Sequence, residues 1–395
     1  MVYSCRSPLA PGGQFLLNGV IASVIIVGAG INGLASAWRL AAAGARVTVI
    51  GKFSVRNDHG GSHGASRIYR TAYADPLYVD LMRTALNEDW PRLELDLLFP
   101  KGGCFFGTPG PKVESYLKAM KTIGPQIFEP LSTSEARKRF GFLSFDESHL
   151  VFHDHSAGVV AAESTCRALE RLARHSGATF LEHTSVETVH DVSEGVCVAT
   201  TSGVLLGDKA VLAAGARLGS LCPELAVTVR PVRQSVLYYP EVPGSDRVWA
   251  WLGEDGFYGL PDFGRGRLKV ARHRLDGTDP PDSPSPRLFD AADVQAFVRT
   301  HFAIDPGPPL AQETCLYAVA PNEDFQLGPL SPDSNILVAS ACSGHAFKFA
   351  PLTGRLVMEW VLEQTSSELA KKLFAKFALR GPESALNPTL FDPTD

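Results

Sequence analysis

A short glycine loop near the start of the chain, Gly28-Ala29-Gly30-Ile31-Asn32-Gly33, places the strongest constraint on the fold. A β-branched apolar run at 23–27 precedes it, helix-favouring residues follow it to about 43, and 46–50 predicts a second strand. This order predicts a βαβ unit of the dinucleotide-binding type. Glycines there permit a tight turn and let backbone amides approach a pyrophosphate at the positive end of the helix. The alternative is that they only ease the packing of helix against strand.

The second strand ends without the acid that such sites usually carry. A carboxylate for the ribose hydroxyls is expected about twenty residues after the glycines. That place holds Gly51-Lys52. The ribose contact is therefore missing or is supplied from elsewhere in the chain.

Size and composition narrow the classes of protein. A chain of 395 residues is long for one core and predicts two domains. The net charge of −5 offers no basic excess for nucleic acid. The apolar stretch at 15–30 is too short to span a bilayer and contains Asn18, so no membrane segment is expected. Seven scattered cysteines fit a reducing compartment, and we expect a cytoplasmic protein.

The hydrophobic pattern predicts further elements along the chain. One helix is expected at 77–98, kinked or interrupted at Pro91. Short strands between 230 and 275, separated by Gly, Pro and Asp, predict an antiparallel sheet in a second domain. The segment 276–286 is expected to be an exposed loop. The other predicted helices are 112–121, 133–140, 163–175, 290–303 and 351–364, and the other predicted strands are 178–182, 186–191, 195–200, 209–213, 312–319 and 335–340.

Three groups of residues could carry chemistry, and each has an ordinary structural alternative. The stretch 60–73 is a Gly-Ser-rich loop with Arg67 and Arg70 three apart, and such arginines are usually solvated. Cys315 lies in a predicted strand, where a cysteine is usually a small buried hydrophobe. Lys269 lies near the end of a predicted strand, where a lysine usually faces solvent.

Five segments jointly resemble the family of monomeric sarcosine oxidase, N-methyltryptophan oxidase and pipecolate oxidase. They run from about 22 to 365 in the family's order. The segments are the glycine loop, Gly60–Tyr73 (GGSHGASRIYRTAY), Tyr258-Gly259-Leu260-Pro261 with Lys269 and His273, Cys315–Phe325 (CLYAVAPNEDF), and Ser343–Phe349 (SGHAFKF). Two departures accompany Gly51. Asn322 replaces a common acid, and 349–355 is closer to the pipecolate-type relatives, which makes sarcosine itself a doubtful substrate.

The resemblance implies a role for each matching residue. Cys315 matches the cysteine that forms a thioether with the flavin 8α-methyl, and Lys269 matches the lysine that assists oxygen. Arg70 and Lys348 match the pair that holds the substrate carboxylate. Tyr258 and His273 match active-site residues, although His273 could also be a satisfied core or surface histidine. The implied cofactor-binding set is Gly28, Gly30, Gly33, Ser62, His63, Arg67, Val186, Cys315, Gly344 and Lys348, and no metal is implied.

The expected fold class is α/β with antiparallel β. A discontinuous Rossmann-like FAD-binding domain is expected from 22–82, 152–224 and 318–378, and an antiparallel-sheet substrate domain from 83–151 and 225–317. Residues 1–21 are expected to be an extension and 379–395 an irregular tail. The resemblance implies a monomer that binds FAD covalently and oxidises a small secondary or cyclic amino acid with O2, which forms H2O2. A flavin dehydrogenase with another electron acceptor, or a non-catalytic nucleotide-binding protein, remains an alternative.

Overall fold

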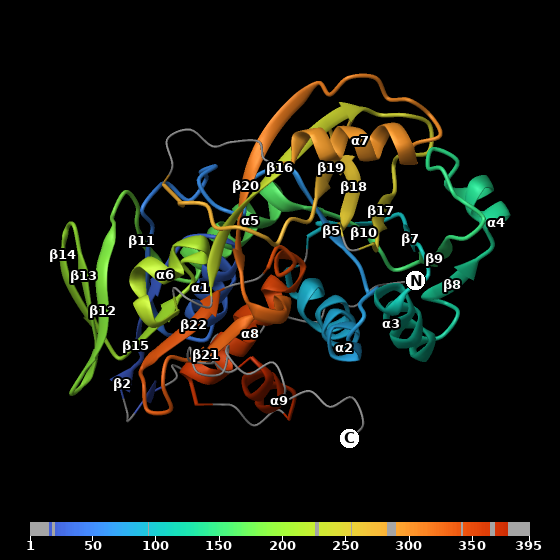
Figure 1. Cartoon of the computed structure of the whole chain (residues 1–395). Helices are drawn as coiled ribbons and strands as arrows, with labels where there is room; N and C mark the ends of the chain where they lie inside the picture. Colours follow the sequence, from blue (N-terminus) through green and yellow to red (C-terminus); the bar gives the residue numbers. More distant parts are fainter. Residues whose placement is uncertain are drawn as a thin grey trace, which may run out of the picture.

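The computed structural model describes residues 16–17, 20–93, 95–225, 229–253, 255–282, 290–340, 343–363 and 368–377. Two large sheets dominate this part of the chain (Figure 1). Among the helices of these ranges, none is both long and apolar enough to cross a membrane. The predicted tail, most of the N-terminal extension, Cys342 and the second half of the expected loop at 276–286 lie outside the described residues.

The first sheet has six strands and contains the βαβ unit. Its order is β11 (Thr179–Leu181), β4 (Arg46–Ile50), β3 (Ser23–Val27), β15 (Lys209–Leu212), β22 (Ile336–Ser340) and β21 (Gln326–Pro329). The first five strands are parallel, and β21 pairs antiparallel with β22. Both faces of β3 are buried, as expected for a parallel strand between two layers.

Alternate side chains of β3 enter two different cores. Val24 and Ile26 pack in the core that contains α1 (Ile31–Ala42), α5 (Ala162–His175) and α8 (Ala350–Val361). Ile25 and Val27 pack on the other face with α6 (Leu218–Leu221) and a small sheet. The strands of that small sheet are β12 (Val186–Val192), β13 (Gly195–Thr200) and β14 (Gly203–Gly207). Figure 1 shows it at the left edge of the molecule.

The second large sheet has eight strands and is antiparallel except where β7 pairs with β17. Helix α7 (Ala291–His301) packs against β16 and β19, as seen at the top of Figure 1. The strand order is β20 (Ala311–Val319), β16 (Arg230–Pro240), β19 (Arg267–Arg272), β18 (Phe257–Asp262), β17 (Val248–Trp251), β7 (Gly103–Gly107), β9 (Leu150–Asp154) and β8 (Phe128–Leu131).

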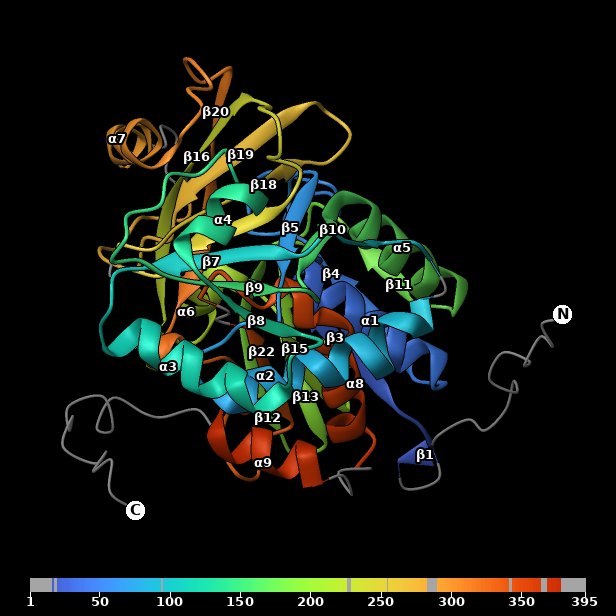
Figure 2. The same cartoon turned by 90° about the vertical axis from the view of Figure 1, so that its right-hand side faces the viewer.

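A small sheet and several helices complete the described chain. In the small sheet, β10 (Gly158–Ala161) pairs with both β5 (Ser66–Tyr69) and β6 (Leu98–Pro100), and Figure 2 shows β5 and β10 side by side. The remaining elements are β1 (Leu16–Leu17), β2 (Val20–Ile21), α2 (Pro76–Thr84), α3 (Pro111–Met120), α4 (Thr133–Arg139) and α9 (Glu368–Lys376).

The helix predicted over 77–98, with a kink or interruption at Pro91, is correct only in part, because the α-helix already ends before Pro91. Helix α2 ends at Thr84 and is followed by a π-helical turn at Ala85–Asp89 and a 3₁₀ turn at Trp90–Leu93. The widened turn presents the fully buried Asp89 carboxylate to Arg39 at 3.0 Å and Arg355 at 2.8 Å. This long-range ion-pair network, together with the missing N–H of Pro91, explains why the helical pattern does not continue.

Candidate functional site

The glycine loop joins β3 to α1 with no room for side chains at two of its positions. Gly28 has a φ of +113°, and a Cβ there would lie 2.4 Å from the Ala213 carbonyl oxygen. A Cβ on Gly33 would lie 1.9 Å from the Gly28 carbonyl oxygen. The Ile31 N–H at the start of α1 donates to Ser62 Oγ at 3.0 Å. The loop therefore lets a ligand approach the backbone at the positive end of α1.

One cavity of about 1700 Å³ extends from this loop to the eight-stranded sheet. Residues of both large sheets line this cavity. Of the site residues predicted from the sequence, Gly33 alone does not line it, because Gly33 lies against the back of the loop. The predicted residues that do line it are Gly28, Gly30, Ser62, His63, Arg67, Arg70, Val186, Tyr258, Lys269, His273, Cys315, Gly344 and Lys348.

Strand β20 presents Cys315 and Tyr317 to this cavity from the same face, since side chains two apart point the same way. Cys315 is buried, and its Sγ lies 3.9 Å from the Gly61 carbonyl oxygen. The hydroxyls of Tyr317 and Tyr258 are 3.2 Å apart. A Cβ on Gly344 would lie 2.2 Å from the Tyr317 ring, so glycine is required where this segment crosses the ring.

Lys269 projects from β19 into the cavity and is buried. Burial, followed by the charge of Arg67, lowers the pKa of the Lys269 ammonium to about 8. Within the described part of the chain, the ammonium forms no hydrogen bond or ion pair with a protein group. It is a desolvated cation available to a small ligand.

Arg70 follows directly after β5 and lines the cavity as a half-buried side chain. Its guanidinium stands 4.1 Å from the Tyr73 ring centroid and 5.7 Å from that of Tyr116. The NH1 atom is buried and has no hydrogen-bond partner. An unsatisfied buried guanidinium nitrogen is costly, and a bound carboxylate would satisfy it.

Lys348 lies beside this arginine, in the 3₁₀ turn Phe347–Phe349 that precedes α8. Its Nζ donates to the Tyr73 hydroxyl at 3.0 Å and to the His345 carbonyl at 2.8 Å. Burial, followed by the Lys348 charge, lowers the pKa of the His345 imidazole to about 3, so the ring is neutral at physiological pH. Arg70 and Lys348 therefore share one buried wall through Tyr73.

His273 carries an acidic partner that the sequence analysis did not include. Its Nε2 lies 2.8 Å from Glu323 Oε2, and the two face the cavity. Burial opposes ionisation of Glu323, but the hydrogen bond and charge of His273 prevail and lower its pKa to about 2. Glu323 is thus a carboxylate at neutral pH.

Arg67 and His63 form hydrogen bonds with the backbone of the glycine-rich segment 60–66. The Arg67 guanidinium donates to the carbonyls of Ser66, Gly61 and His63 at 2.9, 2.8 and 2.5 Å. His63 Nδ1 lies 2.9 Å from the Gly60 carbonyl, and burial lowers the pKa of the ring. Because β5 is a strand, Arg67 and Arg70 do not share a helix face.

Sequence reasoning missed several residues of the cavity wall. Tyr73, Tyr317 and Glu323 stood inside the matched segments, so a closer inspection of those segments would have found them. Arg217 and Asp282 belong to no local pattern, and only the fold places them at the cavity.

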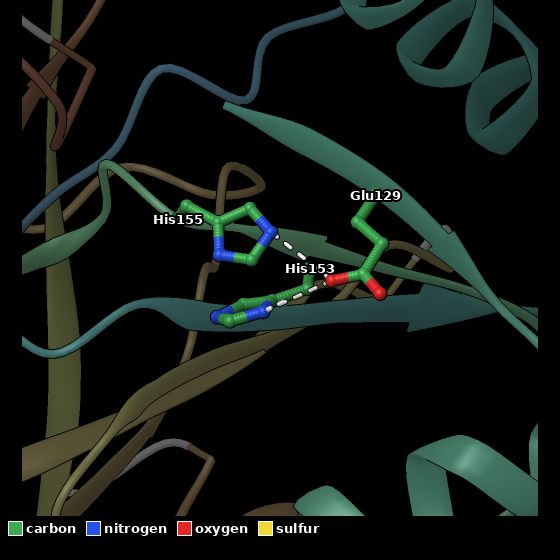
Figure 3. A group of neighbouring side chains, drawn as sticks. All are labelled: Glu129, His153 and His155. Atoms are coloured by element: carbon green, nitrogen blue, oxygen red, sulfur yellow. Dashed lines mark ion pairs between the residues drawn. The ribbon is translucent and has the colours of Figure 1, made fainter. Parts of the chain in front are cut away.

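A second cluster of ligand-type side chains lies at the edge of the eight-stranded sheet, away from the cavity lining. Glu129 Oε2 is 3.0 Å from His155 Nε2 and 3.8 Å from His153 Nδ1 (Figure 3). The Arg139 guanidinium donates to Glu129 at 2.5 Å and lies 3.2 Å from His153 Nδ1. A cation of the protein already engages these atoms, which supports a structural ion-pair role.

Known proteins similar in sequence indicate the family of the chain. The FAD dependent oxidoreductase family matches residues 23–360. Peroxisomal sarcosine oxidase of Homo sapiens is 31% identical over 383 residues, which cover 90% of this chain and 96% of the human protein. N-methyl-L-tryptophan oxidase of Salmonella dublin is 28% identical over 364 residues, covering 87% of this chain and 95% of that protein.

Solved structures show the same fold. NikD, described as an unusual amino acid oxidase essential for nikkomycin biosynthesis, has a TM-score of 0.79 and 25% identity, covering 91% of this chain and 98% of its own. L-proline dehydrogenase from P. horikoshii has a TM-score of 0.78 and 19% identity, covering 91% and 99%. The predicted fold class, a Rossmann-like sheet with a separate antiparallel sheet, is confirmed.

The chain belongs to the FAD dependent oxidoreductase family. Within that family its relatives include sarcosine oxidases and N-methyl-L-tryptophan oxidase, as the matched segments indicated. The protein is an FAD-dependent amine oxidoreductase of the sarcosine oxidase type. The glycine cradle at Gly28 and Gly33 fits a dinucleotide cofactor, and the cavity that starts there is large enough to hold one.

Proposed function

We propose that this protein oxidises the C–N bond of a small secondary or cyclic amino acid to an imine, with O2 as the electron acceptor and H2O2 as the product. One observation carries the proposal. Arg70 holds a buried, unpaired NH1 in the wall that also presents the Lys348 ammonium, inside the cavity that begins at the dinucleotide loop. Two cations on one wall favour a carboxylate ligand. The planar guanidinium can bind both carboxylate oxygens, and the compact ammonium adds a point charge.

The rest of the wall supports an amine next to that carboxylate. Tyr258, Tyr317, Trp251, Phe257 and Leu252 line the cavity, so an apolar ring or N-alkyl group would be covered by aromatic and aliphatic surface. FAD supplies the acceptor for a hydride equivalent. The amine must lose its proton before that transfer, because its lone pair becomes part of the new double bond. Glu323, hydrogen-bonded to His273 at 2.8 Å, adds an ionised carboxylate to the same wall.

Cys315 and Lys269 support a tethered cofactor and oxygen as the acceptor. We propose a thioether between Cys315 Sγ and the flavin 8α-methyl carbon, which would replace the thiol S–H bond and one methyl C–H bond. The two electrons released would reduce the flavin, and O2 would reoxidise it. The tether would keep FAD bound although no acid directly follows β4. The unpartnered, desolvated Lys269 ammonium lies on the neighbouring part of the same cavity. A cation in a dry site stabilises negative charge that develops on oxygen.

The substrate class is tested by anaerobic mixing of the purified protein with sarcosine, pipecolate, proline and N-methyl aromatic amino acids. Bleaching of the yellow flavin by a secondary or cyclic amino acid supports the proposal. Absence of bleaching with every compound would reject it in favour of a nucleotide-binding role. Turnover that is slow with O2 but fast with an electron-accepting dye would instead indicate a dehydrogenase.

We also propose that the protein is a monomer and that it is located in the cytoplasm. The scattered cysteines and the name of the Arthrobacter sp. relative, monomeric sarcosine oxidase, support it, whereas the human relative is named for the peroxisome. Sedimentation of the purified protein and fractionation of its cells test the two parts separately.

A further inference from the structure

The carboxyl end of β4 cannot carry the usual ribose-binding acid. Gly51 occupies that place, and a Cβ there would lie 2.8 Å from the Phe53 carbonyl oxygen and 3.5 Å from the Ala29 side chain. The next residue, Lys52, lines the cavity with a positive charge. If the adenosine ribose hydroxyls bind a carboxylate, that carboxylate must come from another segment.

Asp282 brings a carboxylate to this rim from the other side of the cavity. Its Oδ2 accepts a hydrogen bond from Lys52 Nζ at 2.9 Å, and its Oδ1 accepts one from Arg217 at 2.7 Å. Lys52 follows β4, and Arg217 follows β15, which lies on the opposite side of β3. Asp282 lies after β19 of the eight-stranded sheet. All three residues line the cavity, so the two cations hold the acid over the end of the dinucleotide-binding strands.

The segment that carries Asp282 is fixed to the eight-stranded sheet. The Asp279 N–H donates to the Pro231 carbonyl at 2.7 Å, and the Asp279 carboxylate accepts from the Arg233 N–H at 2.8 Å and from Arg274 at 3.0 Å. Asp282 therefore stands three residues from a buried anchor. Its position does not depend on its own ion pairs alone.

Asp282 is ionised and retains acceptor capacity. Partial burial opposes ionisation, but hydrogen bonds from Arg217 and Lys52 prevail and keep the pKa of Asp282 below its usual value. A carboxylate has about four lone-pair sites, and the described donors leave at least one for a hydroxyl. The rival acid on this rim is Asp58, whose side chain is 84% exposed. Among the described residues, its one ion pair is with His59 of its own loop, at 3.7 Å.

We propose that Asp282 binds the adenosine ribose hydroxyls of FAD, in place of the acid that is missing after β4. The cofactor is then held by both large sheets, since its pyrophosphate rests on the β3–α1 loop while its ribose contacts a segment of the antiparallel-sheet side. This inference requires only that the protein binds FAD, and it does not depend on the amine substrate or on oxygen.

The test measures cofactor affinity in a background without the covalent link. Full-length Cys315→Ala protein, stripped of flavin, is titrated with FAD and separately with FMN, which lacks the adenosine half, and quenching of flavin fluorescence gives each Kd. Asp282→Ala in this background should weaken FAD binding about tenfold or more while FMN binding stays within about twofold, because one charge-assisted hydrogen bond to the ribose is lost. Asp282→Asn should give a smaller loss in the same direction and guards against a folding defect.

Two further variants complete the experiment. Asp276→Asn, an exposed acid of the same segment, is the matched control and should leave both affinities unchanged. Asp58→Asn should do the same. The proposal is overturned if Asp282→Ala leaves FAD affinity unchanged or tighter, if it weakens FMN equally, or if Asp58→Asn reproduces the loss. Since no turnover is measured, a failure here is distinct from a failure of the proposed oxidase reaction.

Discussion

The Lys348 ammonium donates a hydrogen bond to the Tyr73 hydroxyl at 3.0 Å, inside a wall that buries both residues. The Arg70 guanidinium lies 4.1 Å from the centroid of the same Tyr73 ring. One tyrosine thus contacts both cations that we propose to hold the substrate carboxylate. Their spacing is set by β5 on one side and by the turn before α8 on the other.

Tyr73→Phe tests this arrangement. The variant keeps the ring under Arg70 but removes the acceptor for Lys348, which retains the His345 carbonyl. We expect substrate or a carboxylate inhibitor to bind about fivefold more weakly, with little change in the maximal rate of flavin reduction, since one hydrogen bond is worth about 1 kcal/mol. Stopped-flow reduction at several substrate concentrations separates the two. A fall in the limiting rate with unchanged affinity would argue against a positioning role.

Lys269→Met should affect the reaction with oxygen. Because the pKa of Lys269 is about 8, the rate of flavin reoxidation should fall as pH rises through that value, as the ammonium becomes neutral. In the methionine variant reoxidation should be on the order of a hundredfold slower and independent of pH in this range. Flavin reduction is the internal control. Equal slowing of reduction and reoxidation would refute the oxygen role.

The Glu323–His273 pair predicts an acid-sensitive contribution to stability. The pKa of Glu323 is about 2 in the folded protein and near 4.3 in an unfolded chain, so the pair stabilises the fold above the higher value. That stabilisation is lost as pH falls from about 4.3 towards 2. The melting temperature of Glu323→Gln should therefore be lower than that of the wild type at pH 6, and the difference should shrink as the pH is lowered. A constant difference would show that the pair does not titrate in this way.

Cys315→Ser tests the covalent tether. Acid-denatured wild-type protein should precipitate with its yellow colour, whereas the serine variant should release the flavin into the supernatant. Spectra of pellet and supernatant provide the measurement. Release of all colour from the wild type would show that FAD is held without a covalent bond. Cys104, buried on another strand and away from the cavity lining, offers a matched Cys→Ser control that should keep the colour.

The local hydrophobic pattern was sufficient to predict several helices and strands. The β3–α1–β4 unit and strand β13 lie where the hydrophobic pattern predicted them, and β17, β18 and β19 lie within the region 230–275 that was predicted to form short strands. Strand β5 was hidden because its four residues follow a Gly-Ser-rich loop and pair with β10, some ninety residues later. The end of α2 before Pro91 was not predicted, because the buried Asp89 has partners far along the chain, at 39 and 355.

The candidate site shows the same contrast between what a local motif predicts and what depends on contacts between distant residues. Cys315 and Lys348, which line the cavity, could be singled out from the sequence because the short motifs around them are specific. Asp282 and Arg217 could not, because their neighbourhood arises only when a segment after β19 folds over the ends of β4 and β15. The sequence around an acidic loop residue does not show which distant residues the fold will bring next to it.

Anaerobic reduction of the bound flavin by pipecolate, compared with piperidine, tests the central claim most directly. The two amines share a ring and differ in the carboxylate, so the comparison isolates the contribution of Arg70 and Lys348. We predict rapid bleaching of the wild type by pipecolate or another cyclic or N-methyl amino acid, a preference over the decarboxylated amine of at least about a hundredfold, and loss of that preference in Arg70→Met. Equal reduction by the amine with and without its carboxylate, or a preference that survives in Arg70→Met, would contradict the account.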